Sequence, residues 1–232
     1  MRIIIFTDSL GRPRPDMNEA DRTFYSDVYG YKLKEYFKCK HDIELLYIES
    51  LDTEEAVHWS QRMVAFREPD LVIFHLGIND CVPRLFKKGN KSIIFNTFFR
   101  KITFDFFLKL FSYFRYKITK LRPIVYVKKD DFYKNFQKII FEIKKYSKDV
   151  QFISIGISKS DILNKKSFSY NKNVEEYNKI LKQIFEEGYV EINNITEKYG
   201  FISDNLHLTK ESHSALYEVL KVKIEEITKC AE

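Results

Sequence analysis

The chain has few cysteines, no long apolar run and no flexible linker. Three cysteines, Cys39, Cys81 and Cys230, lie far apart and form no CxxC pair. Such a sparse, odd set argues against a disulfide framework or a zinc cluster and suits a reducing compartment. No run of 18 apolar residues is present, so no membrane-spanning helix is predicted. The apolar run Ile3–Phe6 is too short for a signal peptide, and we therefore expect a cytoplasmic protein.

Length and composition predict one folded domain. The chain has 232 residues, of which 44% are hydrophobic and 31% charged. These proportions are typical of a soluble globular protein, and the length suits one sizeable core. We therefore expect a single domain over 1–232.

Apolar runs alternate with longer amphipathic stretches along the chain. The runs predict five strands, at Arg2–Phe6, Ile43–Tyr47, Leu71–Leu76, Val150–Ile155 and Tyr189–Ile192. The amphipathic stretches predict helices at Tyr25–Phe37, Thr53–Phe66, Asp131–Tyr146, Val174–Phe185 and Lys210–Thr228. Near-continuous apolar strands that alternate with helices predict an α/β fold whose parallel sheet is covered on both faces. Ligands of such folds bind beyond the carboxyl ends of the strands.

A basic, aromatic segment from about residue 84 to residue 129 interrupts this alternation. Between Arg84 and Lys129 it contains thirteen Lys or Arg and one acid, Asp105, and is rich in Phe and Tyr. Because glycine is scarce there, Ile93–Lys120 is expected to form one or two helices. Three interpretations stay open: a lid packed on the core, an amphipathic membrane-binding element, or a partner or oligomer interface. Basic residues interleaved with aromatics also suit nucleic acid, but nothing else in the chain resembles a nucleic-acid-binding module, so no such partner is expected.

Three short motifs lie at predicted strand ends or helix starts. Thr7-Asp8-Ser9-Leu10-Gly11 follows the first strand, where backbone N–H groups of a turn can face a developing oxyanion. Gly77-Ile78-Asn79-Asp80 follows the third strand and supplies a side-chain amide donor. Asp204-Asn205-Leu206-His207 precedes the last helix, and its carboxylate can orient the imidazole three residues on. Each motif alone is a weak signal, but their order and placement together indicate nucleophilic catalysis.

In these motifs the chain resembles the SGNH hydrolases, also called GDSL esterases. The GxND block is complete, the DxxH block is followed by Leu208-Thr209, and the GDS block has Thr7 in place of its glycine. The resemblance implies a flavodoxin-like, three-layer αβα fold with a five-stranded parallel sheet, to which the basic segment is a helical insert. It also implies hydrolysis or transfer of an ester-linked acyl group without a metal or an organic cofactor.

The resemblance assigns roles to individual residues. Ser9 is the expected nucleophile, His207 the base and Asp204 its orienting carboxylate. The oxyanion donors fall on the Ser9 backbone and Asn79, with Gly77 in the same block. The family's second block also contributes a glycine N–H, but this chain has no glycine between Gly30 and Gly77.

The stretch that corresponds to the second block is 49–53, where Leu51 or Asp52 can still supply a backbone N–H. The Asp52 carboxylate, however, would bring a repulsive charge close to the oxyanion. His75, within the third strand, and His213, within the last helix, are expected to be packing residues rather than bases.

The substrate is less constrained by the sequence. Arg12 and Arg14 follow the nucleophile in the stretch Gly11-Arg12-Pro13-Arg14-Pro15. They are candidates either to clamp an anionic substrate group or to form a solvated loop. Asp80 is a candidate substrate-site residue, although a role in holding its loop is favoured. We expect an esterase for an O-acyl, in particular O-acetyl, group of an acidic carbohydrate or glycolipid, as in members of the family linked to bacterial surface polysaccharides. Two alternatives remain: an O-acyltransferase that uses the same residues, and a catalytically silent module that binds a membrane or a partner.

Overall fold

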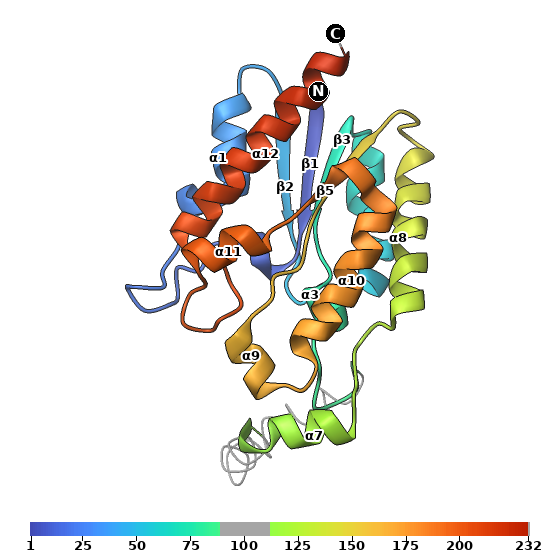
Figure 1. Cartoon of the computed structure of the whole chain (residues 1–232). Helices are drawn as coiled ribbons and strands as arrows, with labels where there is room; N and C mark the ends of the chain where they lie inside the picture. Colours follow the sequence, from blue (N-terminus) through green and yellow to red (C-terminus); the bar gives the residue numbers. More distant parts are fainter. Residues whose placement is uncertain (89–111, 232) are drawn as a thin grey trace, which may run out of the picture.

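The computed structural model describes residues 1–88 and 112–231. Its core is a five-stranded parallel sheet in the order β2-β1-β3-β4-β5. The strands are β1 (Arg2–Thr7), β2 (Asp42–Tyr47), β3 (Leu71–His75), β4 (Gln151–Ile155) and β5 (Tyr189–Val190). Because all five run the same way, their carboxyl ends meet at one edge of the sheet (Figure 1).

Helices cover both faces of the sheet, which confirms the predicted three-layer αβα architecture. One layer contains α1 (Tyr29–Phe37), α11 (Asn193–Tyr199) and α12 (Lys210–Ala231). The other contains α2 (Thr53–Trp59), α8 (Lys129–Lys144) and α10 (Tyr170–Phe185), as Figure 1 shows on the opposite side of the strands.

The alternation of side chains along β1 explains why the sheet needs both layers. Ile3 and Ile5 belong to the core under α1 and α12, whereas Ile4 and Phe6 belong to the core under α8 and α10. All four are completely buried. Burial of such a side chain contributes about 1.5–3 kcal/mol. Removal of either layer would therefore expose apolar side chains along the whole of β1.

The predicted elements match the structure with differences at short or irregular segments. The segment 25–37 is a 3-10 turn, Tyr25–Asp27, followed by α1. The helix expected over 53–66 continues past α2 as a π turn, Ser60–Val64, and a 3-10 turn, Ala65–Arg67. Three helices were not predicted: α3 (Ile78–Cys81), α9 (Asp161–Lys166) and α11. They have four to seven residues, which is too short for a clear apolar period.

The described part of the insert contains α7 (Arg115–Leu121), which agrees with the carboxyl end of the helix expected over 93–120. The rest of that prediction, residues 93–111, lies outside the described residues. Arg84 and Ile124 pair through a backbone hydrogen bond of 2.8 Å at the base of the insert. The Arg115 guanidinium donates to Ser167 Oγ at 2.6 Å and holds α7 against the connection between α9 and α10.

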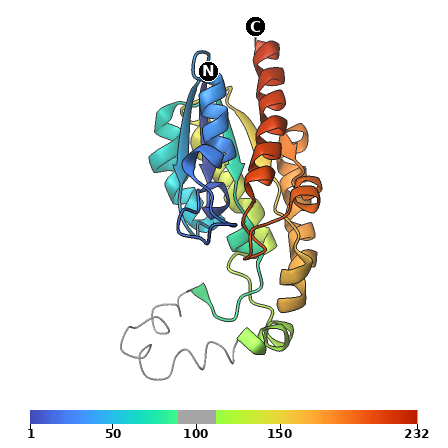
Figure 2. The same ribbon diagram turned by 90° about the vertical axis from the view of Figure 1, so that its left-hand side faces the viewer.

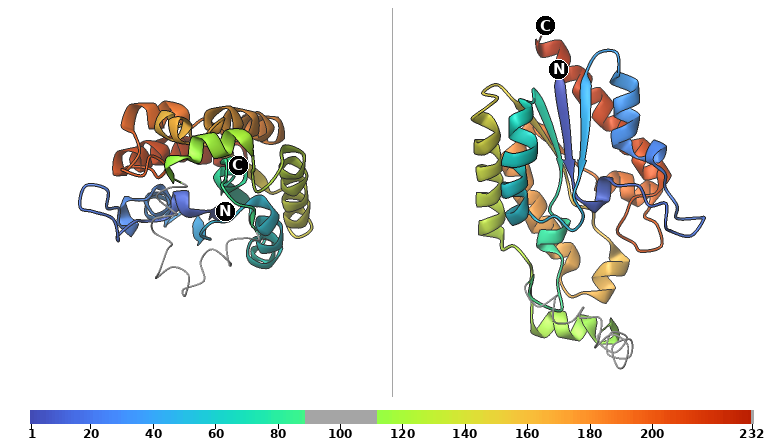
Figure 3. Two further views of the ribbon diagram at one scale, coloured as in Figure 1. Left: turned by 90° about the horizontal axis from the view of Figure 1, so that it is seen from below. Right: turned by 180° about the vertical axis from the view of Figure 1, so that it is seen from behind.

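Figure 2 and the right-hand view of Figure 3 show α7 beyond the carboxyl ends of the strands and apart from the sheet. Tyr113 and Leu121 are each 82% exposed, so these two side chains do not pack on the core as a lid would. The phenylalanines from Phe95 to Phe111 lie outside the described residues. Among the helices of the described ranges, none has the length and apolarity to cross a membrane.

Candidate active site

Ser9 lies in a tight turn at the carboxyl end of β1. Asp8 caps the 3-10 turn Ser9–Gly11, and its Oδ1 accepts a hydrogen bond from Leu10 N–H at 2.8 Å. The Asp8 N–H donates to the His75 carbonyl of β3 at 3.3 Å, which ties the turn to the neighbouring strand. Ser9 is the first residue of the turn, so its N–H has no acceptor within the turn and is available to a ligand.

Thr7 and Gly11 form a complementary pair behind this turn. Thr7 is fully buried, and its Oγ1 lies 3.3 Å from the His75 carbonyl oxygen, to which it donates. A Cβ at Gly11 would lie 2.6 Å from Thr7 Cγ2 and 2.9 Å from the Tyr29 hydroxyl. The threonine that replaces the first-block glycine is therefore accommodated because residue 11 has no side chain.

His207 is presented by a second turn just before α12. Asp204 Oδ1 accepts from the Leu206 and His207 N–H groups at 2.9 and 3.0 Å. Asn205 has a φ of 61°, a left-handed conformation that asparagine tolerates better than most residues. The sequence Asp-Asn-Leu-His thus folds back on itself and turns the imidazole toward Ser9.

The two turns bring Ser9, His207 and Asp204 into one hydrogen-bonded relay. Ser9 Oγ lies 3.2 Å from His207 Nε2, and His207 Nδ1 lies 2.5 Å from Asp204 Oδ2. Partial burial disfavours ionisation of Asp204, but hydrogen bonds from the ring and backbone of His207 outweigh it and lower its pKa to about 2. An ionised Asp204 favours a proton on Nδ1, which leaves Nε2 free to accept the Ser9 proton.

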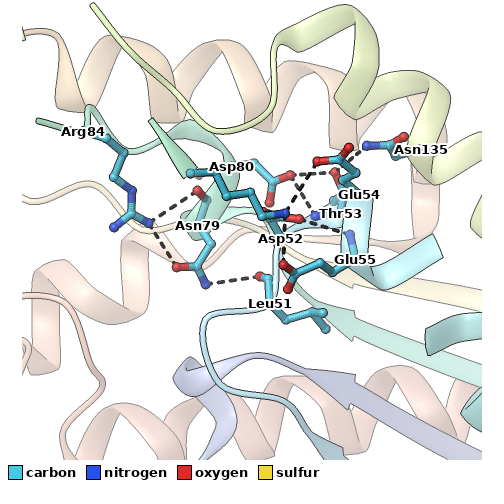
Figure 4. Close-up of polar contacts among 10 residues, drawn as sticks. Leu51, Asp52, Thr53, Glu54, Glu55, Asn79, Asp80, Arg84 and Asn135 are labelled. Carbon is cyan, nitrogen blue, oxygen red and sulfur yellow. Dashed lines mark hydrogen bonds and ion pairs between the residues drawn. The ribbon is translucent and has the colours of Figure 1, made fainter. Parts of the chain in front are cut away.

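Asn79 lies beside Ser9's turn, and its side-chain amide is held on both sides (Figure 4). Nδ2 donates to the Leu51 carbonyl at 3.1 Å, as Figure 4 shows, and to Asp8 Oδ2, also at 3.1 Å. Oδ1 accepts from the Arg84 guanidinium at 3.0 Å. A cation on the amide oxygen polarises the amide and strengthens its N–H groups as donors. For Asn79 to hold an oxyanion, one of those N–H groups must leave its present acceptor.

Comparisons with known proteins agree with this geometry at the level of the fold. No family model matches the chain, and no curated protein matches it in sequence.

Its structure is similar to that of an acetyl xylan esterase, AlAXEase. The two share 13% sequence identity with a TM-score of 0.61, and the match covers 97% of this chain and 100% of the other. A lipase/acylhydrolase from Enterococcus faecalis has 14% identity and a TM-score of 0.63, over 97% and 95% of the two chains. The acetylxylan esterase Axe2 from Geobacillus stearothermophilus has 14% identity and a TM-score of 0.58, over 94% and 91%. The chain has the SGNH-hydrolase fold.

The second-block stretch of this SGNH fold adopts a left-handed turn without glycine. Ser50 has a φ of 56°, in the region that favours glycine. Leu51, directly after it, is fully buried and turns its carbonyl toward Asn79. Asp52 caps α2 through the Glu55 N–H and pairs with Lys88 Nζ at 2.6 Å. The repulsive charge expected from Asp52 is therefore matched by a cation at the start of the insert.

Asp80 and Asp8 are buried carboxylates beneath the site. Asp80 Oδ1 accepts from the N–H and hydroxyl of Thr53 at 2.9 and 2.5 Å, which joins α3 to the start of α2. Burial raises the pKa of both carboxyls to about 7. Since Asp80 is fully buried, the structure gives it a place in holding the loop, and its contact with substrate stays a prediction.

Gly77 caps α3 with a φ of 116°, and a Cβ there would lie 2.8 Å from Ile157 Cδ1. This glycine is thus required by the backbone, whereas its part in an oxyanion hole stays a prediction.

The two arginines after the nucleophile differ in their surroundings. Arg12 forms an ion pair with Glu49. The Arg14 guanidinium instead contacts His207 Nε2, the nitrogen that faces Ser9. Arg14 is thus part of the site's immediate surroundings, whereas the charge of Arg12 is already matched.

The two other histidines near the site are packed in the core, as expected. His75 hydrogen-bonds the Tyr29 hydroxyl through Nδ1 at 3.1 Å, and His213 stacks on the same tyrosine ring. Burial lowers the pKa of both histidines to about 3, so both are neutral at ordinary pH. Neither contacts Ser9.

Within residues 1–88 and 112–231, no cluster of three His, Cys, Asp or Glu side chains is placed to hold a metal ion. A hollow lined by Met1, Asp70, Phe185 and neighbouring residues lies at the amino ends of the strands, which is the edge opposite Ser9. The candidate site is therefore identified by the hydrogen-bonded side chains of Ser9, His207 and Asp204, and not by this hollow. Sequence reasoning missed Arg84 and Lys88, which stand in the basic segment and carry no motif signal of their own.

Proposed function

We propose that the chain is a serine esterase that removes an O-acyl group, preferably acetyl, from a carbohydrate. The relay Ser9–His207–Asp204 is the observation that carries the proposal. Its members come from two distant segments of sequence and meet at the carboxyl edge of a parallel sheet, where α/β folds bind ligands. The structural neighbours named as acetyl xylan esterases support an acetylated carbohydrate as the substrate class.

The reaction has two acyl transfers. Ser9 Oγ attacks the ester carbonyl while His207 Nε2 takes the hydroxyl proton, and the Ser9 N–H and an Asn79 N–H stabilise the oxyanion. Collapse of the tetrahedral species breaks the bond from the carbonyl carbon to the sugar oxygen, and that oxygen receives the proton from His207. Water then attacks the acyl-enzyme, gives its proton to His207, and releases acetate as Ser9 recovers its proton. Asp204 holds the imidazole throughout and stabilises its charged form.

The test is hydrolysis of mono-acetylated xylosides and glucosides by the wild type and by Ser9→Ala. Loss of the nucleophile should lower kcat by about 10³-fold or more while far-ultraviolet circular dichroism stays unchanged. Free sugar acceptors in the same assay reveal transfer, because an acyltransferase would move acetate to the acceptor instead of releasing it. Equal activity of the folded variant would overturn the proposal.

A further inference from the structure

The Arg14 guanidinium and the Ser9 hydroxyl approach the same atom. Arg14 Nη2 contacts His207 Nε2, and Ser9 Oγ lies 3.2 Å from that nitrogen. With Nδ1 protonated toward Asp204, Nε2 has a single lone pair, in the plane of the ring. Two donors compete for it, so Arg14 in this position weakens the contact through which His207 takes the Ser9 proton.

Arg14 stands without an ion pair among residues 1–88 and 112–231. In the described part of the chain its guanidinium has no ion-pair partner, and its Nε is buried without a hydrogen bond. Asp204, Asp16 and Asp8 act on it only at longer range, while burial and the neighbouring Arg12 lower its pKa. A half-buried cation with an unused donor and no ion-pair partner among the described residues is a site for an anion.

The backbone holds Arg14 in this place. Its N–H donates to the Thr23 carbonyl at 2.9 Å, and the Thr23 N–H donates back to the Arg14 carbonyl at 3.2 Å. The same loop is joined to the turn that carries His207, because Ser203 N–H donates to Asp21 Oδ1 at 3.0 Å. Prolines on both sides of Arg14 restrict the backbone further. The guanidinium is therefore anchored beside the relay and can move only through its own side chain.

We propose that Arg14 makes the esterase selective for acylated carbohydrates that carry a carboxylate or another anionic group close to the ester. This inference rests on the proposed function. The anionic group takes the guanidinium in a charge-assisted pair, Arg14 leaves His207 Nε2, and the nitrogen becomes free for the Ser9 proton. With a neutral ester Arg14 stays on the imidazole and slows the first acyl transfer. Arg14 thus binds an anionic substrate, and with a neutral substrate it keeps His207 Nε2 from accepting the Ser9 proton.

A matched pair of substrates tests this inference: a mono-acetylated methyl glucoside and the corresponding glucuronide. The glucuronide carries a carboxylate where the glucoside carries a hydroxymethyl group. The wild type should show kcat/KM at least about tenfold higher for the glucuronide. Arg14→Gln should raise kcat on the neutral glucoside, lower kcat/KM on the glucuronide and so remove the preference. Increasing salt should reduce the preference of the wild type, since charge recognition is screened. A variant that loses activity equally on both substrates would overturn the inference, as would an unchanged ratio.

Arg22→Gln is the control, because it removes the same charge from the same loop. The Arg22 side chain donates to the Met17 carbonyl and does not contact the relay, so this variant should keep the wild-type ratio.

A neutral fluorophosphonate distinguishes failure of the esterase proposal from failure of the role given to Arg14. If neither the wild type nor Arg14→Gln reacts at Ser9, the esterase proposal itself fails. If both react at the same rate, only the role of Arg14 fails.

Discussion

His207 connects the other two members of the relay because its two ring nitrogens face opposite partners. Nε2 faces Ser9 and Nδ1 faces Asp204. His207→Ala should cost about as much activity as Ser9→Ala, since the two act as one unit. Asp204→Asn should lower kcat by about 10²- to 10⁴-fold, because an amide can stabilise the wrong tautomer.

His213→Phe is the control for these variants. It replaces a buried imidazole stacked on Tyr29 with a ring of similar shape, and kcat should change little. Ester hydrolysis rates and thermal unfolding of the wild type, Ser9→Ala, His207→Ala, Asp204→Asn and His213→Phe check both statements. An essential His213 and a dispensable His207 would show that α12, and not the turn before it, carries the base.

Asp80 predicts a pH effect on stability. Its pKa is raised to about 7 by burial, with Asp52 adding to the rise and the hydrogen bonds from Thr53 opposing it. In the unfolded chain an aspartate ionises near pH 4. Between about pH 4 and 7 the unfolded state therefore loses its proton while the folded state keeps it, so stability falls as pH rises.

Asp80→Asn removes this titration while it keeps an acceptor for Thr53. The urea midpoint of the variant minus that of the wild type should therefore be larger at pH 8 than at pH 5. Urea unfolding of both proteins at the two pH values measures the difference, and Asp8, whose pKa burial also raises to about 7, contributes equally in both chains. An identical difference at both pH values would show that Asp80 is ionised throughout.

The sequence predicts the residues of the site better than it predicts the side chains that contact and hold them. Ser9 and Asn79 stand in motifs at strand ends, and Asp204 and His207 in a motif just before the last helix, a placement that predicts their meeting. Arg84 polarises Asn79 from a segment with thirteen basic residues, so sequence alone does not distinguish it from the other twelve. The contact of Arg14 with His207 depends on a loop pairing with Thr23 that has no period to detect.

At the scale of elements, the turn after β1 depends on the fit between Thr7 and Gly11. Gly11→Ala would place a methyl group 2.6 Å from Thr7 Cγ2, so the turn that holds Ser9 must shift. We expect a loss of about 1–3 kcal/mol in unfolding free energy and a marked fall in kcat. Thr7→Gly together with Gly11→Ala should recover part of both, and a double-mutant cycle measures the coupling. Purely additive effects would show that the two residues do not restrict each other.

The long elements are predicted well because their apolar periods report directly on burial. β1, β3 and α8 appear within two residues of their expected bounds. Short helices such as α3 and α9 are set by caps and tertiary contacts, and Ser160 caps α9 through the Leu163 N–H. Their existence depends on neighbours distant in sequence, which is why the pattern of apolar residues does not show them.

At the scale of the whole molecule, positive charge is concentrated on one segment. The insert carries thirteen Lys or Arg against one acid. Lys117 and Leu121 of α7, and Tyr113 just before it, are exposed, and α7 lies beyond the carboxyl edge of the sheet (Figure 2). We expect the protein to sediment with anionic phosphatidylserine vesicles at low salt and to be released as salt rises.

Lys117→Glu with Lys120→Glu should weaken vesicle binding by more than about tenfold, since each cation near an anionic surface contributes about 1 kcal/mol and reversal also adds repulsion. Lys134→Glu with Lys138→Glu, on the exposed face of α8, is the matched control and should retain binding. If the wild type does not sediment with such vesicles at low salt, the membrane interpretation of the insert is wrong.

The central claim is that Ser9 is an activated nucleophile, and covalent labelling by a fluorophosphonate tests it most directly. The reagent phosphonylates a serine whose proton a neighbouring base removes, and peptide mass spectrometry then locates the adduct. The account predicts a single adduct on Ser9 that is absent in Ser9→Ala and strongly slowed in His207→Ala. A folded wild type that does not react, or an adduct that persists on another serine when Ser9 is replaced, would contradict it.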